Sequence, residues 1–209
     1  MNTVRLNHCA IVLLAAGISG RMGTPKQVLV YEGKSLLRRS VEAALGTGIR
    51  PVFVILGANH VLLEKEMENI KEIRIVFNHG WPEGMAASIR CGVAAAMQLE
   101  PDLDGLIMMV CDQPFVSSEL LEELLHTQHQ TGKPVVASSY LDKPGVPAFF
   151  HKSFFSNLMA LQGDTGARKI LKDQAALVAL VPFPEGATDI DTISDFNGLN
   201  KLKKEERRD

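Results

Sequence analysis

The sequence predicts one α/β domain in which helices cover both faces of a mostly parallel sheet, giving three layers, α/β/α. Short apolar and β-branched segments recur along the chain, and several are continuous, as in strands that are buried on both faces. Helical patterns lie between many of them, which is typical of a parallel sheet. At 209 residues the chain can bury one sizeable core. The candidate strands are CAIVLLA, PVFVIL, IRIVF, GLIMMVC, KPVVASS, VPAFF and LVALV.

The expected helices follow from apolar residues that repeat at helical spacing within residues 37–45, 89–97, 120–125 and 154–159. The first contains Leu37, Val41 and Leu45, and Ser35 stands before it as an expected N-cap. The second contains Ile89, Val93 and Met97. The third follows the pair Ser117–Ser118, and Glu119 there favours the positive end of a helix dipole.

Composition and charge predict an ordinary globular protein with one domain, residues 1–200, and a solvated tail, residues 201–209. The net charge of −2 predicts neither a nucleic acid nor a membrane partner, so any anion site has to be local. The first apolar run is too short for a membrane span. Cys9, Cys91 and Cys111 show no metal-binding spacing, which favours reduced thiols in a cytoplasmic protein.

A glycine loop that carries positive charge follows the first strand, in VLLAAGISGRMGTPKQVLV, residues 12–30. Its glycines, Gly17, Gly20 and Gly23, fit neither GxGxxG nor GxxxxGK[ST]. Glycines nevertheless let backbone N–H groups approach an anion, and Arg21 and Lys26 add cationic donors. The loop is therefore a candidate phosphate cradle, and the alternative is a turn with surface charges.

Asp112 stands at the carboxyl end of GLIMMVC, where open α/β sheets place their ligand crevice. Pro114 biases Gln113 toward an extended backbone, which keeps the carboxylate at the strand end. The alternative is that Asp112 only begins a turn. A bound triphosphate would bring a magnesium ion that needs oxygen ligands, and TDIDTISDF offers Asp189 and Asp191 as further carboxylates.

The pattern LAAGxSxRMGxxK resembles the signature loop of the MobA-like NTP transferases, and most of all the branch that attaches CMP to the molybdenum cofactor. The resemblance implies a Rossmann-like sheet of the nucleotide-diphospho-sugar transferase type. It implies catalytic roles for Arg21, Lys26 and Asp112, and magnesium ligation by Asp112 and Asp191, with Asp189 as the competing choice. The loop residues implied to bind nucleotide are Leu14, Ala15, Ala16, Gly17, Gly20, Arg21, Met22, Gly23 and Lys26.

Three further segments resemble parts of the family's binding site. WPEGMAASIRCGV resembles its base-binding element, which implies that Gly84 and Met85 approach the ring and that Ser88 binds its edge. The alternative for Ser88 is a cap of the 89–97 helix. GVPAFF and LQGDTGARKIL resemble acceptor elements, which implies that the N-terminus of the helix in the second segment and the Arg168 side chain receive the acceptor's phosphate. The implied acceptor residues are Gly145, Pro147, Gly163, Asp164, Gly166 and Arg168.

Together these resemblances imply a magnesium-dependent transfer of CMP from CTP to a molybdopterin-type cofactor, with release of pyrophosphate. An acceptor phosphate is already mostly dianionic at neutral pH, so the protein has to position groups and neutralise charge. The guanylyl branch carries LAGG where this chain has LAAG, so Ala16 is expected to favour CTP over GTP. The alternatives are a sugar phosphate or another alcohol phosphate as acceptor, or a non-catalytic carrier. A molybdenum-dependent dehydrogenase is a further implied partner.

Overall fold

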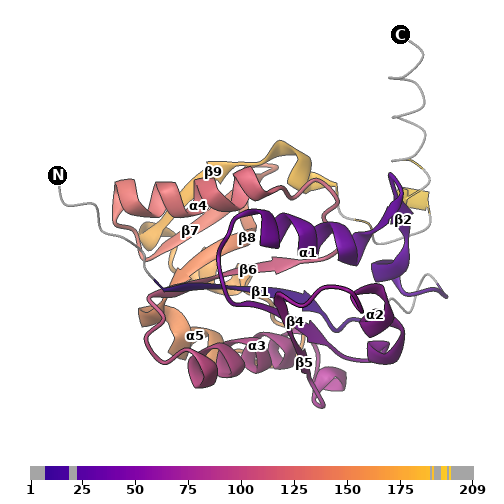
Figure 1. The fold of residues 1–209 in the computed structure, drawn as a ribbon. Helices are drawn as coiled ribbons and strands as arrows, with labels where there is room; N and C mark the ends of the chain where they lie inside the picture. Colours follow the sequence, from indigo (N-terminus) through magenta and orange to yellow (C-terminus); the bar gives the residue numbers. More distant parts are fainter. Residues whose placement is uncertain (1–7, 19–22, 189, 191–193, 197, 199–209) are drawn as a thin grey trace, which may run out of the picture.

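The computed structural model describes residues 8–18, 23–188, 190, 194–196 and 198. Their central sheet has seven strands in the order β5-β4-β1-β6-β8-β7-β9 (Figure 1). Each of the seven segments that the sequence marks as a strand contributes one, so this part of the prediction is confirmed. The strands are β1 (Cys9–Ala15), β4 (Val52–Leu56), β5 (Ile73–Phe77), β6 (Gly105–Val110), β7 (Val135–Tyr140), β8 (Lys143–His151) and β9 (Val178–Pro182).

The sheet is mostly parallel, as expected, with one reversed strand. Strands β5, β4, β1 and β6 pair in parallel, and β7 pairs in parallel with β9. Strand β8 runs antiparallel to both β6 and β7. The reversal follows from the tight connection between β7 and β8, where Leu141 and Asp142 have φ angles of 50° and 56°. Two residues of positive φ are typical of a hairpin turn.

Helices cover both faces of the sheet, as Figure 1 shows, which confirms the three-layer prediction. The side chains of β1 alternate between the two resulting cores. Ile11 and Leu13 belong to one apolar cluster, while Val12 and Leu14 belong to the other. The first cluster receives α1 (Leu36–Gly46), α2 (His60–Glu66) and α4 (Ser118–Thr131). The second receives α3 (Met85–Leu99), α5 (Phe155–Met159) and α6 (Arg168–Asp173).

Two helix starts agree with the sequence and one does not. The Ser35 hydroxyl accepts from the Arg38 N–H at the start of α1, and the Ser117 hydroxyl accepts from the Leu120 N–H at the start of α4. Ser88, however, lies inside α3, which begins at Met85 after Gly84. The capping interpretation of Ser88 is therefore wrong.

The apolar face of α3 also differs from the expected one at its end. Ile89 and Val93 are buried as predicted, but the Met97 side chain is 47% exposed and Ala96 is buried instead. An α-helix has 3.6 residues per turn, so residues spaced four apart shift gradually around the helix and the later ones leave the buried face.

Gly92 allows α3 to approach the sheet closely. A Cβ at this position would overlap Val12 Cγ1 and lie 3.2 Å from Ile55 Cγ1. We expect Gly92→Ala to lower the free energy of unfolding by about 1–2 kcal/mol, because overpacking outweighs the higher helix propensity of alanine. Urea denaturation measures the change, and Gln98→Ala on the exposed face of α3 is the control. A Gly92→Ala protein as stable as the parent would contradict this packing.

The remaining elements are short. Strands β2 (Val30–Tyr31) and β3 (Lys34–Ser35) form a small hairpin that the sequence analysis did not predict. No helix among the described residues is long and apolar enough to cross a membrane. The predicted tail, residues 201–209, lies outside the described residues. The 3₁₀ helices are η1 (Lys26–Val28), η2 (Trp81–Glu83), η3 (Lys152–Phe154), η4 (Ala175–Leu177) and η5 (Pro184–Ala187).

The three cysteines are free thiols, as the sequence predicts. Burial raises the pKa of Cys9 to about 12, with a smaller contribution from the Asp104 carboxylate. Burial likewise raises the pKa of Cys111 to about 12, and the neighbouring Asp112 carboxylate adds to this. Both groups therefore stay protonated at neutral pH, which makes them poor nucleophiles and poor metal ligands.

Candidate active site

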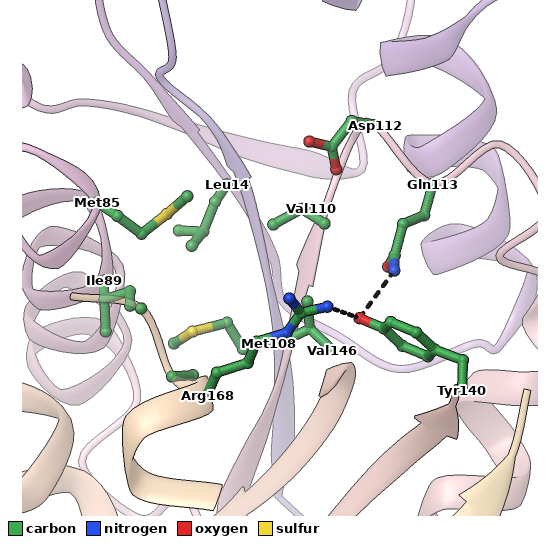
Figure 2. A pocket seen from close by; sticks show the side chains of 12 residues that line it. Leu14, Met85, Ile89, Met108, Val110, Asp112, Gln113, Tyr140, Val146 and Arg168 are labelled. Atoms are coloured by element: carbon green, nitrogen blue, oxygen red, sulfur yellow. Dashed lines mark hydrogen bonds between the residues drawn. The ribbon is translucent and has the colours of Figure 1, made fainter. Parts of the chain in front are cut away.

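Two adjacent pockets open at the carboxyl ends of the parallel strands, where open α/β sheets bind their ligands. Leu14, near the end of β1, and Met85, the first residue of α3, line both pockets. The loop pocket has a volume of about 390 Å³ and is further lined by Ala16, Gly17, Ile18, Trp81, Pro82, Gly84, Ser88 and Asp164. The inner pocket has a volume of about 250 Å³ and is shown in Figure 2. It is further lined by Ile89, Met108, Val110, Asp112, Gln113, Tyr140, Val146, Gly166, Ala167 and Arg168.

The ends of the glycine loop are held together by Gln27. Its buried side-chain amide donates to the carbonyl oxygens of Ala15 at 3.1 Å and of Gly17 at 2.9 Å. The chain therefore returns after the loop to the place where it left β1. Gly23 has a φ of 66°, which glycine adopts without strain. Gly20, Arg21 and Met22, which the resemblance assigns to this loop, lie outside the described residues.

The end of β1 is packed against the end of β4 at Gly57. A Cβ on Gly57 would lie 2.6 Å from the Ala16 carbonyl oxygen and 2.9 Å from Ala16 Cβ. Because Gly57 has no side chain, Ala16 can sit close to β4 and still line the loop pocket. Ala15, in contrast, points into the first apolar core.

Lys26 and Asp112 form an ion pair although 86 residues separate them in the sequence. The Lys26 Nζ lies 2.5 Å from Asp112 Oδ2, and the two side chains are 18% and 21% exposed. This burial shields the pair from the solvent screening that weakens surface ion pairs. The pairing brings the cationic end of the glycine loop onto the carboxylate at the end of β6, and both residues were predicted for the site.

The chain segment that carries the other candidate ligands passes beside Asp112. The Ile190 N–H donates to the Asp112 carbonyl oxygen at 3.1 Å, and the Ile190 side chain is fully buried. Asp189 and Asp191, its two neighbours in the sequence, lie outside the described residues. The structure thus places Ile190, which stands between the two candidates in the sequence, beside Asp112.

A divalent metal ion fits what is described of this region. The Asp112 carboxylate lines the inner pocket and already accepts a cation, the Lys26 ammonium group, at one of its oxygens. Carboxylate oxygen is the ligand that hard cations such as Mg²⁺ prefer. Among the described residues, no cluster of three His, Cys, Asp or Glu side chains could hold a metal ion by itself.

The first turn of α3 and the loop before α6 are in direct contact. Gly84 has a φ of 105°, and a Cβ there would overlap Asp164 Oδ1 and lie 2.7 Å from the Gly163 carbonyl oxygen. That carbonyl accepts from the Ala86 N–H at 3.0 Å. Asp164, which the resemblance assigns to the acceptor, therefore lies in the loop pocket with Gly84 and Ser88. The structure thus places one predicted acceptor residue in the same pocket as two predicted base-binding residues.

Ser88 is oriented by Asn78, a residue that no sequence motif indicates. Its hydroxyl accepts from Asn78 Nδ2 at 3.1 Å, and both side chains are buried. The Asn78 Oδ1 in turn accepts from the Gly80 N–H at 3.0 Å. The Ser88 hydroxyl keeps its own hydrogen, which can be donated toward the loop pocket.

Polar groups gather at one side of the otherwise apolar inner pocket. The Tyr140 hydroxyl accepts from Arg168 Nη2 at 2.9 Å and from Gln113 Nε2 at 3.2 Å (Figure 2). Gln113 Nε2 also donates to the Gly186 carbonyl oxygen at 3.3 Å. Arg168 and Gly166 were predicted, whereas Tyr140 and Gln113 were not. Helix α6 has only six residues, so its dipole is weak. The group of this helix that can bind an anion is therefore the Arg168 side chain.

Three of the predicted acceptor residues line neither pocket, namely Gly163, Gly145 and Pro147. A Cβ on Gly145 would overlap the Tyr140 hydroxyl oxygen, so this glycine makes room for the tyrosine. The Pro147 carbonyl accepts from the buried Ser138 hydroxyl at 2.7 Å. Val146, which stands between Gly145 and Pro147 in β8, is the residue of this strand that lines the inner pocket.

The sequence matches a known family over most of its length. A family model described as MobA-like NTP transferase domain covers residues 11–178. The chain belongs to this family. The matched range includes the glycine loop, Lys26, Asp112, Tyr140 and Arg168. The family resemblance drawn from the sequence motifs is thus confirmed.

Relatives within this family carry different names. Nicotine blue oxidoreductase from Paenarthrobacter nicotinovorans is 34% identical over 90% of this chain and 94% of its own length. Purine catabolism protein PucB from Bacillus subtilis (strain 168) is 28% identical over 91% of this chain and 95% of its own length. A probable molybdenum cofactor guanylyltransferase from Bacillus mycoides (strain KBAB4) is 25% identical over 75% of this chain and 74% of its own length.

The fold is also found in solved structures. The crystal structure of Rv0371c from Mycobacterium tuberculosis H37Rv is 28% identical, covers 92% of this chain and 97% of its own, and has a TM-score of 0.79. A structure of the same protein in complex with manganese is 24% identical, again covers 92% of this chain and 97% of its own, and has a TM-score of 0.76. These similarities agree with a Rossmann-like nucleotidyltransferase fold.

Proposed function

We propose that the protein transfers CMP from CTP to a molybdopterin-type cofactor, with a divalent metal ion, Mg²⁺, and release of pyrophosphate. The observation that carries the proposal is the pair of adjacent pockets that share Leu14 and Met85, with the Lys26–Asp112 ion pair at the inner pocket. Two pockets in contact can hold two substrates at once, which a direct transfer between them requires. We place this activity in one domain, residues 1–200.

In this proposal the loop pocket takes the nucleotide. The glycine loop binds the triphosphate, as the sequence predicts, and the Lys26 ammonium group leaves Asp112 to bind a phosphate oxygen. Asp112 is then available to hold the metal ion, which supplies positive charge to the phosphates when bound. Lys26 stabilises the negative charge that grows on the departing pyrophosphate.

The inner pocket takes the acceptor. An oxygen of the acceptor's phosphate monoester attacks the α-phosphorus of CTP, and the bond from that phosphorus to the pyrophosphate oxygen breaks. The attacking group is mostly a dianion at neutral pH, so no protein base has to remove a proton. The protein therefore contributes position, exclusion of water and charge. The name of the relative from B. mycoides supports an acceptor of the molybdenum cofactor type.

The decisive experiment incubates the purified protein with each NTP, Mg²⁺ and molybdopterin, and measures pyrophosphate release. We expect release with CTP and molybdopterin together. Release with a sugar phosphate instead would move the acceptor assignment to that class. No release with any pair, combined with tight binding of the finished cofactor, would favour a carrier that serves a molybdenum-dependent dehydrogenase.

The base preference depends on Ala16. Its methyl group lines the loop pocket and narrows the space for a two-ring base. We expect kcat/KM for CTP to exceed that for GTP by about 10- to 200-fold, as for other discriminations by one methyl group. Ala16→Gly is expected to narrow this ratio without reversing it, because Ser88 also contacts the base edge.

The matched control for this prediction is Ala15→Gly. The Ala15 side chain packs in the first apolar core and does not line the loop pocket, so its removal should leave the CTP to GTP ratio unchanged. A parent protein that prefers GTP would overturn the cytidylyl assignment. An unchanged ratio in Ala16→Gly would remove Ala16 from base selection.

A further inference from the structure

The Tyr140 side chain stands at the centre of the polar side of the inner pocket. Figure 2 shows Arg168 and Gln113 reaching its hydroxyl from different elements, α6 and the segment after β6. The guanidinium carbon of Arg168 also lies 5.4 Å from the centre of the Tyr140 ring. A hydrogen bond and a cation–π contact thus fix the same arginine to the same tyrosine.

The surrounding backbone is built to hold the ring in this position. A Cβ on Gly145 would overlap the hydroxyl oxygen and lie 2.5 Å from Tyr140 Cζ. A Cβ on Gly186 would lie 2.6 Å from Tyr140 Cδ1. The ring also packs edge-on against Phe183, with 6.3 Å between the ring centres. Two glycines and an aromatic contact therefore set the place of the hydroxyl independently of Arg168.

The hydroxyl group has one hydrogen-bonding capacity left. Its oxygen accepts from Arg168 and Gln113, which occupies both lone pairs. Its own hydrogen has no acceptor among the residues that the structure describes. Although the tyrosine side chain is largely buried, it lines the inner pocket. The unused donor and the Arg168 guanidinium therefore stand together at one wall of that pocket.

We propose that the Tyr140 hydroxyl is a direct ligand of the acceptor's phosphate group, donating its hydrogen to a phosphate oxygen beside the Arg168 guanidinium. This inference rests on the proposed function and adds a residue that the family motifs do not include. A phosphate has several acceptor oxygens, so it can accept hydrogen bonds from the Arg168 guanidinium and the Tyr140 hydroxyl at the same time. The Asp112 carboxylate of the same pocket is paired with Lys26 in the nucleotide-free protein. When Lys26 moves to the CTP phosphates, the Asp112 charge acts equally on the parent and on the Tyr140 variant, so it does not affect their comparison.

The test uses inorganic phosphate as the probe. It is titrated into the full-length protein that has been saturated with CTP in the absence of divalent metal, so that the loop pocket is already filled. We expect Tyr140→Phe to weaken phosphate binding about tenfold while CTP affinity stays unchanged. The matched control is Tyr31→Phe, because Tyr31 also stacks with an arginine, Arg39 at 5.0 Å, but lines neither pocket.

A double-mutant comparison separates direct donation from mere support of Arg168. If Tyr140 donates to phosphate itself, Tyr140→Phe weakens binding further in an Arg168→Ala background. No further loss in that background would overturn the proposal, and so would unchanged phosphate binding in the single variant. Phosphate binding needs no turnover, so this result stands apart from the transferase assay. A protein that binds phosphate through Tyr140 but releases no pyrophosphate would disprove the proposed function alone.

Discussion

Asp112→Asn is expected to lower the rate of pyrophosphate release by about a thousandfold or more, with little loss of stability. The amide keeps the size of the side chain but carries no charge, so it can neither hold a divalent cation as a carboxylate does nor pair with Lys26. The backbone at this position stays anchored, because the Asp112 carbonyl oxygen accepts from Ile190. Initial rates at saturating substrates and a thermal melt measure the two effects.

Asp104→Asn is the matched control for this prediction. Asp104 also pairs with a lysine, Lys152 at 3.2 Å, but it lies away from both pockets. Because exposed pairs contribute about 0–1 kcal/mol, this variant should keep both its activity and most of its stability. Near-normal turnover in Asp112→Asn would show that the metal assignment is wrong.

Lys26→Met is expected to reduce kcat/KM by about 10²- to 10³-fold, with most of the loss in kcat. The methionine keeps much of the length of the side chain but removes the charge that, in the proposed function, faces the leaving pyrophosphate. A second effect follows from the ion pair, because the Asp112 carboxylate loses its cationic partner. The nucleotide-free protein should therefore bind Mn²⁺ more tightly. The EPR signal of free Mn²⁺ measures this affinity in a titration.

Lys34→Met serves as the control for Lys26→Met. Lys34 makes an equally short ion pair with Glu42, at 2.5 Å, on an exposed surface. Its loss should change neither kcat nor Mn²⁺ affinity. A loss confined to KM in Lys26→Met, with kcat untouched, would mean that Lys26 only binds nucleotide, and its role toward the leaving group would then be withdrawn.

The fold followed closely from sequence pattern, since strands buried on both faces need continuous apolar runs. The direction of β8 did not follow, because the turn at Leu141 and Asp142 lacks the glycine that usually marks such a hairpin. The small hairpin of β2 and β3 was missed because each strand has only two residues, too few to show a periodicity.

The candidate site divides in the same way. Motif residues such as Ala16, Gly84 and Ser88 were expected together and do surround one pocket. Tyr140 was missed because it ends a strand of mostly buried residues, a position that pattern alone assigns to the core. Gln27 and Asn78 were missed because their partners are set by the folded backbone and leave no local signal. Arg21 and Asp191 lie outside the described residues, so their roles stay predictions.

The two pockets draw on different parts of the chain. Apart from Asp164, every residue that lines the loop pocket comes from the first 88 positions. Apart from Leu14, Met85 and Ile89, every residue that lines the inner pocket comes after position 107. If the two pockets bind the two substrates as proposed, substitutions in the later half can change the binding of one substrate without disturbing that of the other. Leu14 and Met85, which line both pockets, would then hold the two substrates in a fixed relative position. Under the proposed assignment, a chain of this design can diverge toward new acceptors through changes in its second half while its nucleotide-binding half stays unchanged.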